Sequence, residues 1–413
     1  MAAYLKVGKK KNKIKSDPVS KSSPRVTGPT HPVSASPSLK LWILAVACLL
    51  FAGITKWPVA GHSLPSDYTN DVQPFWKALE FNSIRHSGKP TALIDFQEAW
   101  NNPKEPPKYP LGLSQIYLKA WSLTSPKNFN DFMLTGRQAH IILCLLALGL
   151  VLALPLSLEH RILSLAILCL SLVTHQFSLV MRVHAPAGYF VFGACLCSLR
   201  ALTSPKPWLW TSIGGACAGM ATSIFFTGAV AFAPVLAVAP LRQWKGTLQL
   251  KPTLVATALG LLAGLLVFSH HYPTLGKWVA GSSQIINTGE FGKYTGDIEG
   301  KSPWTPTGFL EYANDVFGMD PLLYLGYLGG LILLFRTGDW KKPEWLLVLL
   351  TTLPYQFLMG CMSTNQVRRS SMVKHAATVL SAWAWLRLWK KRRQLALFAL
   401  TILGLWNAAS ILK

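Results

Sequence analysis

Carboxylates in this chain gather in two stretches. Seven lie within about residues 57–136 and six within about 271–320, so the two stretches hold 13 of the 17 aspartates and glutamates. Asp71 opens the segment Asp71-Val72-Gln73-Pro74-Phe75-Trp76, directly before an expected amphipathic helix, and Asp67 precedes it by four residues. A carboxylate there could act as a general base. It could also cap the helix, because Asp is a preferred N-cap and Pro suits a first turn, and the two roles are compatible.

Four cations stand on the same predicted side of a membrane as these carboxylates: Arg182, Arg368, Arg369 and Lys374. Arginine binds phosphate through its bidentate fork, and fixed cations in a water-poor cleft stabilise a leaving group that becomes negative. The other interpretation is that these side chains only reach lipid headgroups. We expect them to bind a lipid phosphate.

Other polar residues leave more than one interpretation open. Glu98 and Asp95 could bind sugar hydroxyls or an acceptor amine, or could belong to a solvated loop surface. Asp67 and Asp71, with His270 and His271, could hold a divalent cation, although their spacing does not demand one. We therefore expect no obligatory metal or other cofactor.

The elements that must position these residues are membrane spans. The chain has 413 residues, of which 51% are hydrophobic and 14% charged, with a mean hydropathy of +0.32. Its apolar runs of about 15–20 residues are long enough to cross a bilayer. We predict an all-α polytopic membrane protein with about eleven spans, at residues 41–56, 137–156, 161–179, 187–203, 208–225, 227–241, 252–270, 321–336, 345–362, 372–388 and 394–411. The span at 227–241 is short and contains Pro234 and Pro240, so it could be broken or re-entrant.

Charge fixes the expected orientation. The formal net charge is +23, which in a soluble protein would suggest a nucleic-acid partner, but the excess lies in residues 1–40 and in short connections between spans. Positive charge in these places is typical of cytoplasmic segments, so we expect no nucleic acid. Residues 1–40 are predicted to be a disordered basic cytoplasmic tail, and residues 41–413 an integral membrane domain.

Two outer loops follow from this orientation, at about 57–136 and 271–320. They are too long for plain connectors and must contain structure of their own. The spacing of Ile116, Tyr117, Ala120 and Trp121 predicts an amphipathic helix that lies on the membrane.

The order of these features resembles the glycosyltransferase C superfamily, and within it the lipid-phosphate-sugar transferases related to aminoarabinose and mannosyl transferases. The resemblance covers about residues 41–390. It rests on Asp71 with Phe75 and Ala78, Lys108-Tyr109-Pro110-Leu111-Gly112, Arg137 at the start of the second span, Met181-Arg182-Val183-His184-Ala185-Pro186, the glycine-rich stretch 214–221, Gly289-Glu290-Phe291-Gly292-Lys293-Tyr294, and Arg368-Arg369 with Lys374-His375.

The resemblance implies a glycosyltransferase that moves a sugar from a polyprenyl-phosphate carrier to an acceptor by inverting displacement. It implies Asp71 as the base with Asp67 beside it, a lipid phosphate on the four cations, and substrate contacts from Tyr109, Glu98, Glu290 and Tyr294. Glycolipid, polysaccharide and protein acceptors stay open. The chain has no large soluble C-terminal domain, which argues against the oligosaccharyltransferase branch. We expect a multi-pass protein of the bacterial cytoplasmic membrane, surrounded by membrane lipid, with its site on the extracytoplasmic face.

The main alternative is a transporter or flippase of lipid-linked or polar solutes. That class places charged residues within its spans and repeats its halves. The middles of the predicted spans hold almost no charge, and the two halves do not repeat. A lipid-carrier polymerase or ligase, and a non-catalytic relative, are further alternatives.

Overall fold

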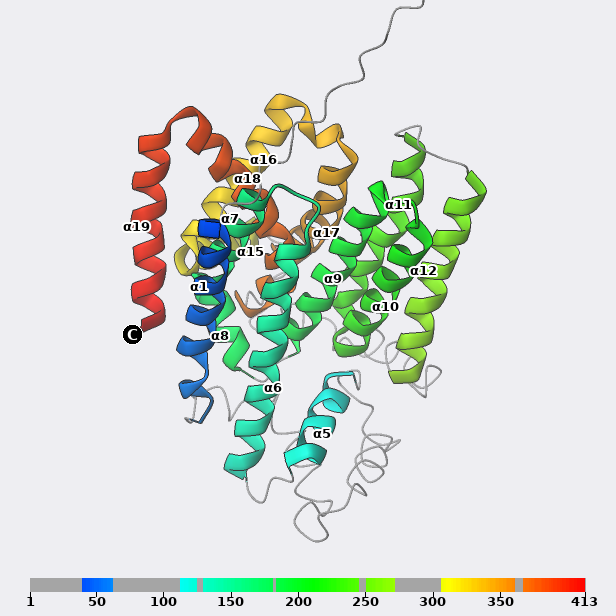
Figure 1. Cartoon of the computed structure of the whole chain (residues 1–413), viewed down its shortest axis with the longest axis horizontal. Coiled ribbons are helices and arrows are strands. Elements are labelled where there is room, and N and C mark those ends of the chain that lie inside the picture. The colour runs from blue at the N-terminus through cyan, green and yellow to red at the C-terminus, as the bar shows by residue number, and fades with distance from the viewer. Residues whose placement is uncertain are drawn as a thin grey trace, which may run out of the picture. The chain divides into compact units, whose positions relative to one another are not determined.

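The computed structural model describes residues 39–61, 112–124, 129–180, 183–244, 250–271, 306–360 and 367–412. The chain divides into two units, Met1–Ser38 and Leu39–Lys413, and all described residues belong to the second. Every regular element among them is a helix (Figure 1).

Each of the eleven segments predicted as spans is helical. They correspond to α1 (Leu39–Lys56), α6 (Phe129–Leu150), α7 (Leu158–Cys169) with α8 (Leu172–Leu179), α9 (His184–Thr203), α10 (Pro207–Ile224), α11 (Phe232–Trp244), α12 (Leu250–His271), α16 (Pro321–Thr337), α17 (Pro343–Gly360), α18 (Lys374–Lys391) and α19 (Arg393–Leu412).

Fewer of these helices meet a strict test for spanning a membrane. Within the described ranges, four stretches are long and apolar enough: Leu39–Gly61, Leu134–Ala153, His184–Thr203 and Arg393–Leu412. The pair α7 and α8 would be a fifth, and Thr253–Ser269 and Pro321–Thr337 are shorter apolar helices. The prediction of a helical membrane protein is supported, and the number of eleven spans stays a prediction.

Two predicted spans are broken. The segment 161–179 bends by 59° between α7 and α8, where Ser171 caps α8 by accepting a hydrogen bond from the Thr174 N–H at 3.0 Å. A serine at this position starts a new helix, so the segment is a bent pair of helices, and the span predicted here stays a prediction. The segment 227–241 is broken as anticipated, with η4 (Phe226–Ala231) before α11.

The two stretches predicted as outer loops contain helices outside the predicted spans. α5 (Gly112–Thr124) confirms the helix expected around Ile116–Trp121, and it buries Leu113 and Tyr117 while Lys119 is exposed. α15 (Pro306–Met319) lies in the second stretch.

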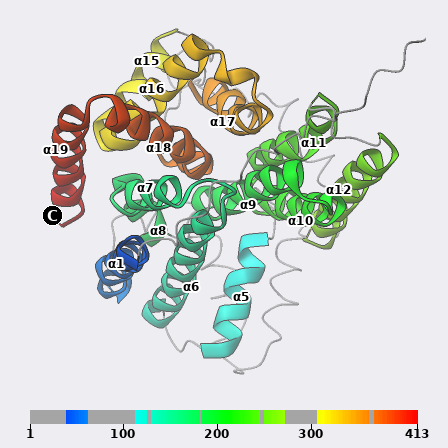
Figure 2. The same cartoon turned by 45° about the horizontal axis from the view of Figure 1, so that its top comes forward.

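Small residues allow one helix pair to pack closely. A Cβ added to Gly215 of α10 would lie 1.7 Å from the Gly260 carbonyl oxygen of α12, and one added to Gly219 would lie 2.1 Å from the Gly264 oxygen. The Thr211 hydroxyl also donates to the Ala256 carbonyl at 2.8 Å. Facing glycines four residues apart are a common device for helix association in membranes, and both views show α10 beside α12 (Figures 1 and 2).

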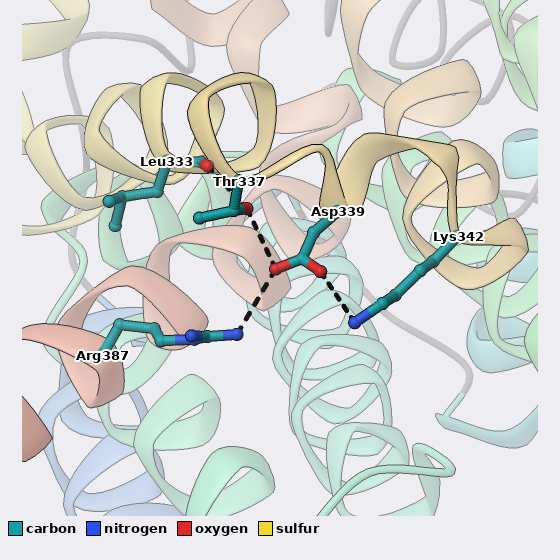
Figure 3. A network of polar contacts seen from close by, with 5 residues as sticks. All are labelled: Leu333, Thr337, Asp339, Lys342 and Arg387. Atoms are coloured by element: carbon teal, nitrogen blue, oxygen red, sulfur yellow. Dashed lines mark hydrogen bonds and ion pairs between the residues drawn. The ribbon is translucent and has the colours of Figure 1, made fainter.

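Cations predicted to be cytoplasmic bind carbonyl groups at helix ends and connections. Arg161 donates to the Leu152 oxygen at 2.7 Å, and Arg242 to the Ser204 oxygen at 3.0 Å. After α16, Asp339 accepts from Thr337 at 3.0 Å and pairs with Lys342 at 2.7 Å and Arg387 at 3.3 Å (Figure 3). This network ties the end of α16 to α18.

Candidate functional site

Most of the predicted site residues lie outside the described residues. These are Asp67, Asp71, Glu98, Tyr109, Arg182, Glu290 and Tyr294. Arg368 and Arg369 fall in η6 (Val367–Met372), and His270 and His271 end α12, but the side chains of all four are outside the description. Lys374 is the predicted site residue whose surroundings the structure describes.

Lys374 opens α18 directly after η6. A Cβ added to Gly188 of α9 would lie 2.5 Å from the Ser371 carbonyl oxygen and 2.8 Å from that of Met372, so only glycine lets η6 approach α9 this closely. The Lys374 side chain is 0% exposed, and its Nζ has no hydrogen-bond partner among the described residues. The packing of η6 on α9 therefore holds a lysine inside the protein at one end of α18.

Asp320 is the buried carboxylate near Lys374, and the two interact electrostatically. It lies between α15 and α16, outside both helices, and is 0% exposed. Its Oδ1 accepts from the Asn407 amide of α19 at 2.9 Å, and its Oδ2 accepts from the Ser171 hydroxyl at the bend between α7 and α8.

The environment of Asp320 favours its neutral form. Burial raises the pKa of this carboxyl group to about 7, although Ser171, Asn407 and Lys374 all act to lower it. Near neutral pH the negative charge beside Lys374 is therefore only partly present.

A second buried lysine was missed by the sequence analysis. Lys56 is the last residue of α1, is 0% exposed, and its Nζ has no hydrogen-bond partner within the described part of the chain. It interacts electrostatically with Lys374 and with His175 of α8. A lysine after an apolar run is usually solvated at the membrane surface, so nothing in the sequence distinguished it.

The segment that follows Lys56 is fixed from α6. Arg137 of α6 donates to the Ala60 carbonyl oxygen in η1 (Pro58–Gly61) at 3.1 Å. The sequence analysis noted this arginine at the start of the second span, and the structure gives it a contact that holds the end of α1.

Aromatic and imidazole groups complete the surroundings of the two lysines. Tyr117 of α5 hydrogen-bonds to His140 Nδ1 of α6 at 3.0 Å, and His140 interacts electrostatically with Lys374. Tyr189 of α9 stands edge-on to His375, with ring centroids 5.3 Å apart. Neither ring nitrogen of His375 has a hydrogen-bond partner among the residues described. The cluster thus offers ammonium, imidazole and hydroxyl donors to a negatively charged group.

Together these residues form a buried cluster that we call the two-lysine cluster: Lys56, Lys374, Asp320, His140, His375, Tyr117 and Tyr189. Its members come from the C-terminal end of α1, the start of α18, the residue before α16, and α5, α6 and α9.

A metal site is not built from the part of the chain that the structure describes. Within it, no three His, Cys, Asp or Glu side chains gather closely enough to hold an ion. Asp67 and Asp71, the carboxylates named for a divalent cation, lie outside it. The divalent cation stays an open expectation.

Comparison with known proteins gives a likeness of fold. No family model and no curated protein sequence matches the chain. Among solved structures it is similar to the Archaeoglobus fulgidus oligosaccharyltransferase tethered to an acceptor peptide, with a TM-score of 0.55 and 12% identity over 91% of this chain and 55% of that one. The same enzyme, AglB, in complex with an inhibitory peptide and a dolichol-phosphate gives 0.52 and 13%, over 90% and 56%. With zinc and sulfate it gives 0.53 and 14%, over 89% and 53%.

This likeness shows that the chain shares the helical fold of the matched part of AglB, and membership of the glycosyltransferase C superfamily stays a prediction. The chain spans just over half the length of the AglB chains it matches. AglB is an oligosaccharyltransferase, and the sequence analysis argued against that branch. The match leaves nearly half of AglB uncovered, so it bears on the helical fold and leaves the branch open. The closer relation to aminoarabinose and mannosyl transferases stays a prediction.

Proposed function

We propose that this chain is a membrane glycosyltransferase that transfers a sugar from a polyprenyl-phosphate carrier to an extracytoplasmic acceptor. The observation that carries the proposal is Lys374, a buried lysine without a hydrogen-bond partner in the described residues, in a chain whose fold resembles AglB. A buried cation of this kind needs an anionic partner, and a lipid phosphate supplies one.

The two AglB complexes suggest the substrates. One contains dolichol-phosphate and another contains a tethered acceptor peptide. By analogy we propose a lipid-phosphate donor and a protein acceptor for this chain, with glycolipid and polysaccharide as the other acceptor classes. Tyr109, Glu98, Glu290 and Tyr294 are proposed to contact the sugar or the acceptor.

The proposed reaction is a single inverting displacement. Asp71, with Asp67 beside it, takes the proton of the acceptor hydroxyl or amine as that atom bonds to the anomeric carbon. The bond between this carbon and the phosphate oxygen breaks, and the polyprenyl phosphate leaves with the electron pair. Its growing negative charge is stabilised by Lys374, and by Arg182, Arg368 and Arg369 in the proposed site.

The buried charges fit this role better than that of a transporter. Transporters place ionisable groups near the middle of their spans. Lys56 ends α1, Lys374 begins α18, and Asp320 precedes α16, so all three stand at helix ends. Charges at helix ends suit a ligand whose phosphate lies at the membrane surface.

The test is mass spectrometry of glycoproteins and glycolipids from a deletion strain. We expect one glycan class to lose a single sugar, wild-type chain to restore it, and Asp71→Asn and Lys374→Met to fail to restore it. Asp17→Asn, in the basic tail, is the matched control and is expected to restore the glycan fully. An unchanged glycan profile in the deletion strain would refute the proposed function, and full activity of Asp71→Asn would refute the assignment of the base.

A further inference from the structure

Lys56 has no role in the function proposed so far. We infer that Lys56 and Lys374 together bind the phosphate group of the carrier lipid, beside the buried carboxyl group of Asp320. This inference rests on the proposed function and adds to it a second cation from the first helix of the fold.

The charge balance of the two-lysine cluster supports this inference. Lys56 and Lys374 are both completely buried, while Asp320 is the single carboxylate among the cluster residues. Burial of a charged group is very unfavourable unless the group is paired and hydrogen-bonded. Neither ammonium group has a hydrogen-bond partner in the described ranges, so six N–H donors point to no acceptor there.

A phosphate monoester matches this deficit. It carries one to two negative charges and three terminal oxygens, each of which accepts strong hydrogen bonds from ammonium groups. One carboxylate oxygen of Asp320 is used by Asn407 and the other by Ser171, so Asp320 is already engaged on both sides. The remaining positive charge calls for an anion from outside the cluster.

The two lysines come from opposite ends of the sequence, and the fold brings them near enough to repel each other electrostatically. Lys56 and Lys374 interact electrostatically, and both interact with groups on neighbouring helices, Lys56 with His175 of α8 and Lys374 with His140 of α6. Arg137 fixes the segment after Lys56, and the close contact of Gly188 with η6 fixes the segment before Lys374. Both cations are thus held by packing and are not free to swing out to solvent.

A different partner for Lys56 is a carboxylate of the outer loop, since Asp67 and Asp71 follow it closely in sequence. An internal ion pair would make Lys56 important for stability and irrelevant for binding the lipid. The experiment must therefore measure stability and ligand affinity separately.

The experiment uses the full chain purified in detergent, with a polyprenyl monophosphate as the probe. Neutral polyprenol, phosphatidylglycerol and inorganic phosphate serve as comparison ligands. The variants are Lys56→Met, Lys56→Arg and Lys374→Met, and the matched control is Lys40→Met at the other, exposed end of α1. Affinity is measured by native mass spectrometry, and stability by the thermal unfolding of each variant without ligand.

We expect Lys56→Met and Lys374→Met each to weaken polyprenyl monophosphate binding by about tenfold or more, as for loss of one charge-assisted contact. Lys56→Arg keeps the charge and is expected to bind within about threefold of wild type. Lys40→Met is expected to bind normally, and weak binding of polyprenol is expected to be equal in all variants.

Other results would overturn the inference in distinguishable ways. One such result is normal binding by Lys56→Met together with weak binding by Lys374→Met. This result removes Lys56 from the site and leaves the proposed function standing, whether or not Lys56→Met is less stable. Normal binding by both variants removes the two-lysine phosphate site, while the glycan profile of the deletion strain still decides the proposed function. Competition by inorganic phosphate or phosphatidylglycerol at equal concentration shows that the cluster does not select the carrier lipid.

Discussion

Asp320 is predicted to make the stability of this protein depend on pH. Its carboxyl group is completely buried, and burial raises its pKa from the ordinary 3.8 to about 7. Between these two values the folded state holds a proton that the unfolded state has lost. Since folding then requires uptake of a proton, the free energy of unfolding falls as pH rises through this window and levels off above about pH 7.

The size of this effect follows from the two pKa values. One pH unit corresponds to about 1.4 kcal/mol, so the whole window corresponds to at most about 4 kcal/mol. Asp320→Asn removes the titration. The asparagine oxygen can still accept one of the two hydrogen bonds from Ser171 and Asn407, and the weakened second bond costs about 1 kcal/mol at every pH.

The assay is thermal unfolding in detergent, followed by tryptophan fluorescence, at pH 5, 6, 7 and 8. We expect wild type to be more stable than Asp320→Asn at pH 5, and the difference to shrink or reverse by pH 8. Asp339→Asn is the matched control, because the hydrogen bond from Lys342 lowers the pKa of Asp339, which therefore does not titrate in this range. A constant difference between wild type and Asp320→Asn from pH 5 to pH 8 would show that Asp320 is not held neutral by burial.

Three further substitutions test the packing and the polar contacts, each by thermal unfolding. Gly215→Ala places a Cβ 1.7 Å from the Gly260 oxygen and is expected to destabilise the α10–α12 pair by about 1–3 kcal/mol. Gly149→Ala is the control and is expected to have no such cost, because open space surrounds Gly149. Equal effects of the two substitutions would contradict the close packing. Tyr117→Phe removes the 3.0 Å hydrogen bond to His140 Nδ1 and is expected to lower the free energy of unfolding by about 1–3 kcal/mol. An unchanged unfolding midpoint would mean that another group takes over the hydrogen bond to His140. Asp339→Asn is expected to lower the free energy of unfolding by less than about 1 kcal/mol, and this difference from wild type is expected to vanish in high salt, because Lys342 and Arg387 are exposed. A destabilisation that does not depend on salt would contradict a screened ion pair.

The helices were predictable from sequence because lipid-soluble segments leave a strong local signal. Runs of apolar residues place all eleven helical segments, with ends that differ by up to eight residues, as at the start of α6. Pro234 lies in the first turn of α11, next to its irregular start, whereas Pro240 lies inside the helix. The bend at Ser171 was not predictable in this way. A serine inside an apolar run is compatible with a continuous helix, and the hydroxyl that caps α8 also donates to Asp320, 149 residues away in the sequence.

The candidate site was predictable only in part, and for a similar reason. Lys374 was selected because it is a cation at the predicted outer end of a span. Lys56 has the same local features as Lys374. Its complete burial distinguishes it from an ordinary solvated lysine, and this burial depends on packing by other helices, which the local sequence does not show. Asp320 was counted among the loop carboxylates without a role, since its partners Ser171 and Asn407 are distant in sequence and carry no charge.

The positions of the charged groups also bear on the predicted topology. Counting spans places the end of α1, the start of α16, the start of α18 and the end of α19 on one side of the membrane. The contacts around Asp320 and the interaction of Lys56 with Lys374 bring these four helix ends together. The opposite ends of α16 and α18 meet in a separate network around Asp339 (Figure 3). Arg387 of this network also lies over the Trp383 ring, 5.0 Å from its centroid.

These two networks differ in the way that the two sides of such an enzyme should differ. Around Asp339 the charges are paired and solvated, as expected for a basic surface that orients the protein in the membrane. Around Lys374 the charges are buried and exceed their described partners, as expected for a site that is completed by an anionic substrate. The asymmetry between the two ends of α18 therefore supports placing the proposed site at the end with Lys374, independently of the carboxylates in the first loop.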